Sequence, residues 1–151
     1  MEVTTLRDGK EEIVEVAEDR IFEFARGLNG FEHHHRYALI PDEDSSIEWL
    51  QSLDDPAVCF PLLEPFLFYP EYAFDLPDHD AEALGLEGPQ DATVRAVITI
   101  REDPEQATAN LLAPVVLNMR TGLGRQVLLQ DSSLPICFEL FEALQLTAEA
   151  A

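Results

Sequence analysis

Hydrophobic residues in this chain alternate with polar ones over many short runs. The clearest run is residues 93–100, where Val94, Ala96, Ile98 and Ile100 share one face and Arg95, Val97 and Thr99 the other. A period of two is typical of a β-strand with one face buried. Similar short runs predict further strands at residues 11–16, 21–24, 36–40, 47–53, 57–63, 107–112, 115–120 and 126–129.

Turn-forming residues separate these runs. Asp54-Asp55-Pro56 joins two of them, residues 27–30 begin and end with glycine, and Gly122-Leu123-Gly124 turns the chain toward its last run as a hairpin would. Residues 80–84 are long enough for one or two helical turns. Short strands at this spacing predict an all-β fold, an antiparallel barrel-like or sandwich domain with at most short helical segments.

Two patterns overlap after Pro135: a period of two at Ile136, Phe138 and Leu140, and helical spacing at Phe141, Leu144 and Ala148. The pattern predicts a strand that runs into a short amphipathic helix. A chain of 151 residues suits one domain. We therefore expect a β domain over residues 1–136 and a C-terminal extension over residues 137–151.

The densest part of the chain is residues 64–78, which contains five aromatic residues and three prolines: Phe66, Phe68, Tyr69, Tyr72 and Phe74, with Pro65, Pro70 and Pro77. Between the last two prolines, apolar positions alternate with Glu71, Ala73 and Asp75. This alternation predicts a short strand with an acidic outer face, preceded by a kinked aromatic loop. The aromatic residues either fill a core or, held by the prolines, form a docking site at the surface.

The charge of the chain is strongly negative. It has 9 basic and 30 acidic residues, for a net charge of −21, and residues 37–94 include no Lys or Arg. Free nucleic acid and anionic membranes should be repelled, and a basic partner should be attracted. A soluble acidic surface without a partner would have the same composition.

No catalytic or metal site emerges from the motifs. Neighbouring side chains of His33-His34-His35 point apart in an extended strand, and no Cys or His lies at zinc-ligand spacing. The two thiols, Cys59 and Cys137, have apolar neighbours and are expected to be buried and free. We therefore predict no catalytic residue, no cofactor and no metal, and a protein that acts by binding others.

One alternative from a different class stays open, a small metal-binding or hydrolytic β-barrel enzyme that would use Asp75, Asp78, His79 and Asp80. These side chains could ligate a cation, although they lack the spacing of a calcium loop. The N-terminus has no basic and apolar signal segment, and no apolar run is long enough to cross a membrane, so a cytoplasmic protein is expected.

An ordered set of short segments resembles the FliW family of flagellar assembly factors. The set covers roughly residues 10–136 and includes Phe31-Glu32, Trp49-Leu50-Gln51-Ser52, residues 65–72, Asp75-Leu76-Pro77, residues 97–100, Asp103-Pro104, residues 108–111, Ala113-Pro114 and residues 124–127. The chain departs from the family at Ala25 and Asn29, where prolines are more frequent, at Leu112, and in its longer apolar tail.

The resemblance implies a non-catalytic β domain with two alternative protein partners. One is CsrA, a small basic RNA-binding homodimer that represses flagellin translation; the other is flagellin, which competes for the same protein. Binding to CsrA at a site away from its RNA surface would relieve the repression. The resemblance implies that the protein itself does not contact nucleic acid. We predict that the partner contacts are Asp54, Asp55, Pro65, Phe66, Phe68, Glu71, Tyr72, Asp75, Asn110 and Leu112.

Overall fold

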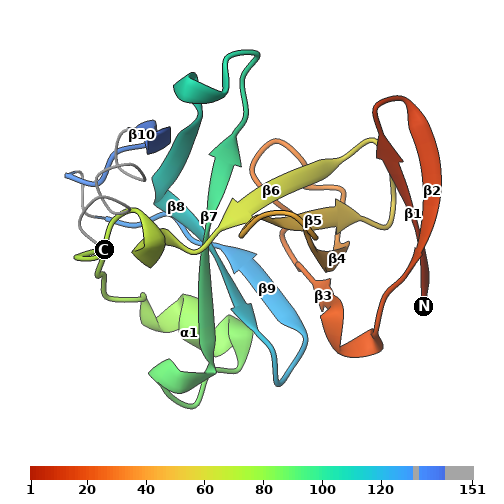
Figure 1. The fold of residues 1–151 in the computed structure, drawn as a ribbon. Coiled ribbons are helices and arrows are strands. Elements are labelled where there is room, and N and C mark those ends of the chain that lie inside the picture. Colours follow the sequence, from red (N-terminus) through yellow and green to blue (C-terminus); the bar gives the residue numbers. More distant parts are fainter. Residues whose placement is uncertain (131–132, 142–151) are drawn as a thin grey trace.

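The computed structural model describes residues 1–130 and 133–141, and its central feature within these residues is a seven-stranded β-barrel (Figure 1). The barrel strands are β3 (Ile21–Glu23), β4 (Arg36–Pro41), β5 (Glu48–Ser52), β6 (Cys59–Leu63), β7 (Ala92–Thr99), β8 (Thr108–Asn118) and β9 (Leu123–Gln126). Their order is β8-β7-β6-β5-β4-β3-β9, and a second pairing between β9 and β8 closes the ring. Neighbouring strands are antiparallel except β3 and β9, which meet in parallel at Glu23 and Leu123. The predicted all-β, barrel-like fold is confirmed.

The barrel interior is a closed apolar core. Its buried members are Phe22, Phe24, Leu28, Tyr37, Leu39, Leu50, Leu62, Val115 and Leu117. The Phe24 ring packs edge-on against Tyr37, with 5.1 Å between ring centroids. A Cβ atom at Gly124 would lie 2.4 Å from the Phe24 ring, so the strand β9 approaches this ring only because residue 124 has no side chain.

The hydroxyl group of Tyr37 is an exception in this core. Among the residues that the structure describes, it is buried without a hydrogen-bond partner. We therefore expect Tyr37→Phe to leave stability unchanged at neutral pH or to raise it by about 1 kcal/mol, because an unpaired buried hydroxyl carries a desolvation cost. Thermal unfolding of the two proteins at pH 7 checks this, and a clear loss of stability would contradict it.

The same residue makes stability depend on alkaline pH. Burial, with a smaller contribution from the charge of Asp54, raises the pKa of Tyr37 to about 12 from 10. Since the folded-state pKa lies above the unfolded value, this contribution is present below pH 10 and is lost as pH rises toward 12. Between these pH values the wild-type protein should therefore lose more stability than the phenylalanine variant.

One outer layer of the barrel is a hairpin of β1 (Glu2–Arg7) and β2 (Lys10–Glu15). Its turn places Asp8 and Gly9 at positive φ angles of 51° and 75°, as a two-residue hairpin turn requires. The hairpin buries Val3 against Ala38 of β4, and the 3-10 helix η1 (Glu18–Arg20) then leads into the barrel. The sequence predicted the second strand of this hairpin but missed the first.

The second outer layer covers the opposite part of the barrel, over β7 and β8. It contains the 3-10 helix η2 (Pro65–Leu67), the aromatic segment after it, the helix α1 (Asp78–Leu84) and the 3-10 helix η3 (Pro89–Asp91). A cluster of buried apolar side chains lies between this layer and the sheet: Leu63, Phe68, Tyr72, Leu84, Ala96, Ile98, Ala109, Leu111, Val116, Val127, Leu129, Leu134 and Leu140.

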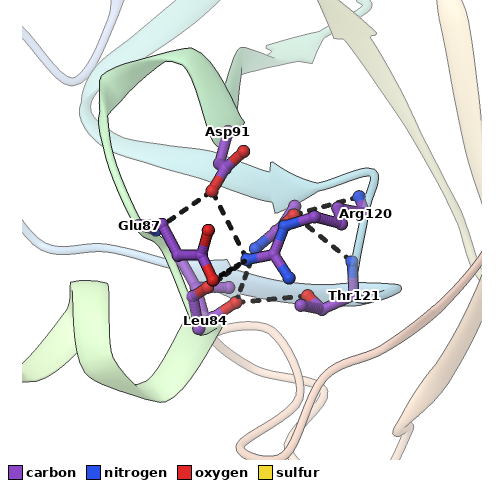
Figure 2. Close-up of polar contacts among 7 residues, drawn as sticks. Leu84, Glu87, Asp91, Arg120 and Thr121 are labelled. Carbon is purple, nitrogen blue, oxygen red and sulfur yellow. Dashed lines mark hydrogen bonds and ion pairs between the residues drawn. The ribbon is translucent and has the colours of Figure 1, made fainter.

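Helix α1 is held by the turn between β8 and β9 (Figure 2). It ends at Gly85, whose φ of 67° is a left-handed conformation that glycine adopts readily. The Asn118 side-chain amide and the Thr121 hydroxyl donate to the carbonyl of Leu84, at 2.9 Å and 3.2 Å. The Arg120 guanidinium donates to the carbonyl of Gly85 at 2.7 Å. Side chains from the turn thus satisfy carbonyls that the helix end leaves unpaired.

Several predicted elements differ from the structure. The strand predicted between Pro70 and Pro77 is wrong: this segment forms no regular secondary structure and pairs with no other strand among the described residues. The two runs around Ala113-Pro114 form the single strand β8, which is bent where Asn110 Oδ1 accepts from the amides of Leu112 and Ala113. The predicted hairpin after Gly122 is confirmed, although β9 already begins at Leu123.

The C-terminal part continues the second outer layer. The 3-10 helix η4 (Pro104–Gln106) precedes β8, and β10 (Phe138–Glu139) pairs with β8, as the alternation after Pro135 predicted. Cys137 is exposed, so its predicted burial is wrong. Cys59 is half-buried, and burial raises the pKa of its thiol. The amphipathic helix predicted for the tail lies outside the described residues.

Candidate partner-binding groove

A groove of about 830 Å³ lies between the aromatic segment, helix α1 and the first half of β7. Its volume is within the range of about 300–1,000 Å³ that is common for binding pockets. Its apolar lining comes from all three parts and includes Phe66, Tyr72, Phe74, Leu76, Leu86 and Val94. Phe66 is 45% exposed, and the adjacent Leu67 is 39% exposed. The groove is therefore an open apolar surface rather than a closed core.

Pro65 is the reason that the groove exists next to β7. The strand β6 pairs with β7 only at Leu62 with Val97 and at Leu63 with Ala96. Pro65 begins the 3-10 helix η2 and has no amide to donate to β7, so pairing along β7 does not continue at this residue. The chain therefore leaves the sheet after Leu63, while β7 runs on in the other direction toward α1 (Figure 1).

The aromatic side chains divide between the groove and the core. Tyr72 lines the groove but is only 3% exposed, and its hydroxyl donates to the carbonyl of Leu111 at 2.6 Å. Burial raises the pKa of Tyr72. Its ring is 6.2 Å from Phe66 and 5.4 Å from Phe74, between ring centroids. Tyr72 thus fixes the position of the more exposed rings on either side of it.

Acidic side chains surround the apolar floor. The exposed residues Glu64, Asp75, Asp78 and Glu87 line the groove. Arg95 is the one Lys or Arg among the described residues that line it, and it lies 2.5 Å from Glu48 in a mostly buried ion pair. Its charge is therefore already compensated within the protein. The rim as a whole is negative, which favours a ligand that has both cationic and apolar groups.

The structure brings together only part of the predicted site. Phe66, Tyr72 and Asp75 line the groove, and Glu71 is exposed on the same segment. Two corrections concern residues in this segment. Phe68 is 3% exposed and stacks near Phe138 at 5.7 Å, so it belongs to the core. Pro65 is buried and acts by ending the pairing of β6.

The other predicted contacts lie elsewhere. Asp54 and Asp55 are exposed in the loop before β6, at the end of that strand opposite to the groove, and the Ser52 hydroxyl accepts from both of their amides. Asn110 and Leu112 lie in the bend of β8, where the Asn110 side chain is engaged with main-chain amides. None of these four residues lines the groove.

The cluster proposed for a cation is arranged differently from a metal site. Asp80 is buried, and its carboxylate accepts from Arg125 at 2.5 Å and lies 3.7 Å from Arg26. His79 Nε2 is 3.2 Å from the same carboxylate. Within the described residues, no group of three or more His, Cys, Asp or Glu side chains is placed to hold a metal ion. Asp80 instead joins α1 to β9.

Sequence reasoning missed the β7 side of the groove, including Val94 and Arg95, and the loop after α1, including Leu86 and Glu87. A signal was available, because Pro65 lies two residues after a predicted strand and indicates that the strand ends there. The sequence does not indicate that β7, the neighbour of β6, extends past the end of β6.

Fold and groove together define a small, acidic β-barrel with an open apolar groove on its outer face. None of the described helices is long and apolar enough to cross a membrane. The family model described as FliW protein matches residues 5–140, and the chain belongs to this family. The resemblance of the short sequence segments is thereby confirmed.

Individual relatives agree with this assignment. A flagellar assembly factor FliW from Bdellovibrio bacteriovorus is 40% identical over 146 residues, covering 96% of this chain and 82% of the relative. One from Caldicellulosiruptor saccharolyticus is 36% identical over 131 residues, covering 87% of this chain and 86% of that protein. A crystal structure of the flagellar assembly factor FliW is similar with a TM-score of 0.84 and 33% identity, covering 93% of this chain and 97% of the other.

Proposed function

We propose that this protein is a cytoplasmic flagellar assembly factor that binds the basic regulator CsrA and, in competition with it, flagellin. Binding to CsrA relieves its repression of flagellin translation, and new flagellin displaces CsrA. The protein acts by binding alone and catalyses no reaction. The observation that carries the proposal is the groove, in which an open apolar floor is surrounded by Glu64, Asp75, Asp78 and Glu87.

Charge and packing have separate roles in this proposal. A protein with a net charge of −21 attracts a basic homodimer at long range and repels the RNA that this homodimer binds. Affinity then depends on a few apolar contacts, because interface energy is concentrated in a small number of buried side chains. Phe66, which lines the groove, and its exposed neighbour Leu67 can supply such contacts.

Calorimetric titration of this protein with purified CsrA tests the proposal, repeated in the presence of flagellin. We expect a complex with CsrA whose apparent affinity falls as flagellin is added. The proposed contact leaves the RNA surface of CsrA free. We therefore expect that added RNA does not displace CsrA from the complex. No binding to either partner would contradict the proposal.

Reversing the charges of Glu71 and Asp75, as Glu71→Lys with Asp75→Lys, should weaken CsrA binding roughly tenfold at low salt. The difference from the wild-type protein should shrink as salt is raised, because exposed charges are screened. Glu11→Lys with Glu12→Lys on the hairpin is the matched control, since both acids are exposed and lie in the other outer layer. Circular dichroism verifies that each variant folds. If both pairs of substitutions weaken CsrA binding equally, the affinity depends on the net charge of the protein and not on the acids at the groove.

A further inference from the structure

The first half of β7 has an open edge inside the groove. Residues 92–95 pair with β8 on one side, and β6 reaches β7 only at Ala96 and Val97 on the other. Ala92, Thr93, Val94 and Arg95 all line the groove. In the described part of the chain no strand continues β6 along this edge, so part of one strand position in the sheet is vacant.

Two contacts indicate which main-chain groups face this edge. The amide of Ala92 donates to the carbonyl of Pro89, and the carbonyl of Val94 accepts from the Arg95 guanidinium at 2.9 Å. Neither partner belongs to β8. In an antiparallel ladder, alternate residues direct both main-chain groups to the same neighbour. The main-chain groups of Ala92 and Val94 therefore point toward the groove, and those of Thr93 and Arg95 toward β8. Because the Ala92 amide and the Val94 carbonyl already have these partners, the Val94 amide and the Ala92 carbonyl are the groups left for an added strand.

We propose that a protein partner binds here by strand addition, placing an extended segment of alternating apolar and basic residues along residues 92–95 of β7. This inference rests on the proposed function and specifies the form of the bound segment. Strand addition takes its affinity from main-chain hydrogen bonds and its specificity from alternate side chains. Apolar side chains of the added strand pack on Phe66 and Leu86, and basic ones reach Asp75 and Asp78.

The observations favour this occupant over two others. A helix would fill the apolar groove, but all its interior main-chain groups are already paired, so it could not use the open edge of β7. A second copy of this chain has the same charge of −21 and is repelled by the acidic rim. An extended segment with basic side chains matches both the edge and the charge.

Amide hydrogen exchange, read residue by residue by NMR, tests the proposal. In the free protein the Val94 amide should exchange faster than those of Thr93 and Arg95, which the β8 ladder protects. Saturation with purified CsrA, and separately with flagellin, should slow exchange at Val94 at least roughly tenfold in one of the two complexes. Size-exclusion chromatography of the same samples shows whether each complex has formed.

The outcomes separate this inference from the proposed function. A complex in which the Val94 amide exchanges as fast as in the free protein overturns strand addition but leaves partner binding intact. Slower exchange of Val94 without change in the amides of β2 supports strand addition. If neither partner forms a complex, the proposed function fails and the inference fails with it.

Discussion

Filling the groove with a tryptophan at position 73 should weaken partner binding at least roughly 30-fold, which corresponds to about 2 kcal/mol. Ala73 is exposed and lines the groove, so Ala73→Trp adds an indole ring to the space that a partner would occupy. The substitution removes no buried contact of the protein itself. We therefore expect the thermal unfolding midpoint to stay close to that of the wild-type protein.

Ala57→Trp is the matched control for this experiment. Ala57 is also exposed, but it lies with Asp54 and Asp55 in the loop at the opposite end of β6. Calorimetric titration with CsrA should distinguish the two variants. Normal binding by Ala73→Trp would contradict an interface at the groove, and a loss of binding in Ala57→Trp alone would place the interface at the Asp54–Asp55 loop.

Removal of the Asp80 carboxylate should have the largest effect on stability, about 3–5 kcal/mol for Asp80→Ala. The Asp80 side chain is 4% exposed and that of its partner Arg125 15% exposed, so the substitution leaves a mostly buried guanidinium without its counter-charge. For a chain of this length the unfolding midpoint should fall by roughly 10 °C. Differential scanning calorimetry measures both quantities.

Two further variants test the reason for this loss. Asp78→Ala changes an exposed carboxylate on the same helix and should cost less than about 1 kcal/mol. Asp80→Ala combined with Arg125→Met should recover most of the stability, because no unpaired charge is then left buried. If the double variant is no more stable than Asp80→Ala alone, the unpaired charge is not the cause. Since α1 forms one wall of the groove, we also expect Asp80→Ala to weaken partner binding.

The barrel was predictable because its strands alternate apolar and polar residues and are separated by recognisable turns. Residues 93–100 alternate so regularly that β7 follows from the sequence, and the Asp54-Asp55-Pro56 turn fixes the hairpin of β5 and β6. The aromatic segment shows the limit of the same reasoning. Tyr72, Phe74 and Leu76 do turn inward, and Ala73 and Asp75 outward, as predicted. The alternation comes from packing against the barrel, however, and not from pairing in a sheet.

The candidate site was less predictable because half of it comes from distant residues. The sequence drew attention to Phe66, Tyr72 and Asp75, which the structure places in the groove. It grouped them with Asp54 and Asp55, which five residues of β6 separate from the groove. That strand spans about 15 Å, and a strand at residues 57–63 was itself predicted, so the grouping by charge disregarded a separation that the sequence indicated. The burial of Phe68 could not be predicted, because Phe66 and Phe68 are the same residue type in the same aromatic run and only the structure shows that Phe68 is buried and Phe66 exposed.

The most direct test of the central claim is to map chemical shift changes in the main-chain amides of this protein during titration with CsrA. We predict that the largest changes fall on residues 64–78 and 92–95, around the groove. Changes confined to the Asp54–Asp55 loop or to the hairpin of β1 and β2, with the groove unaffected in the complex, would contradict it.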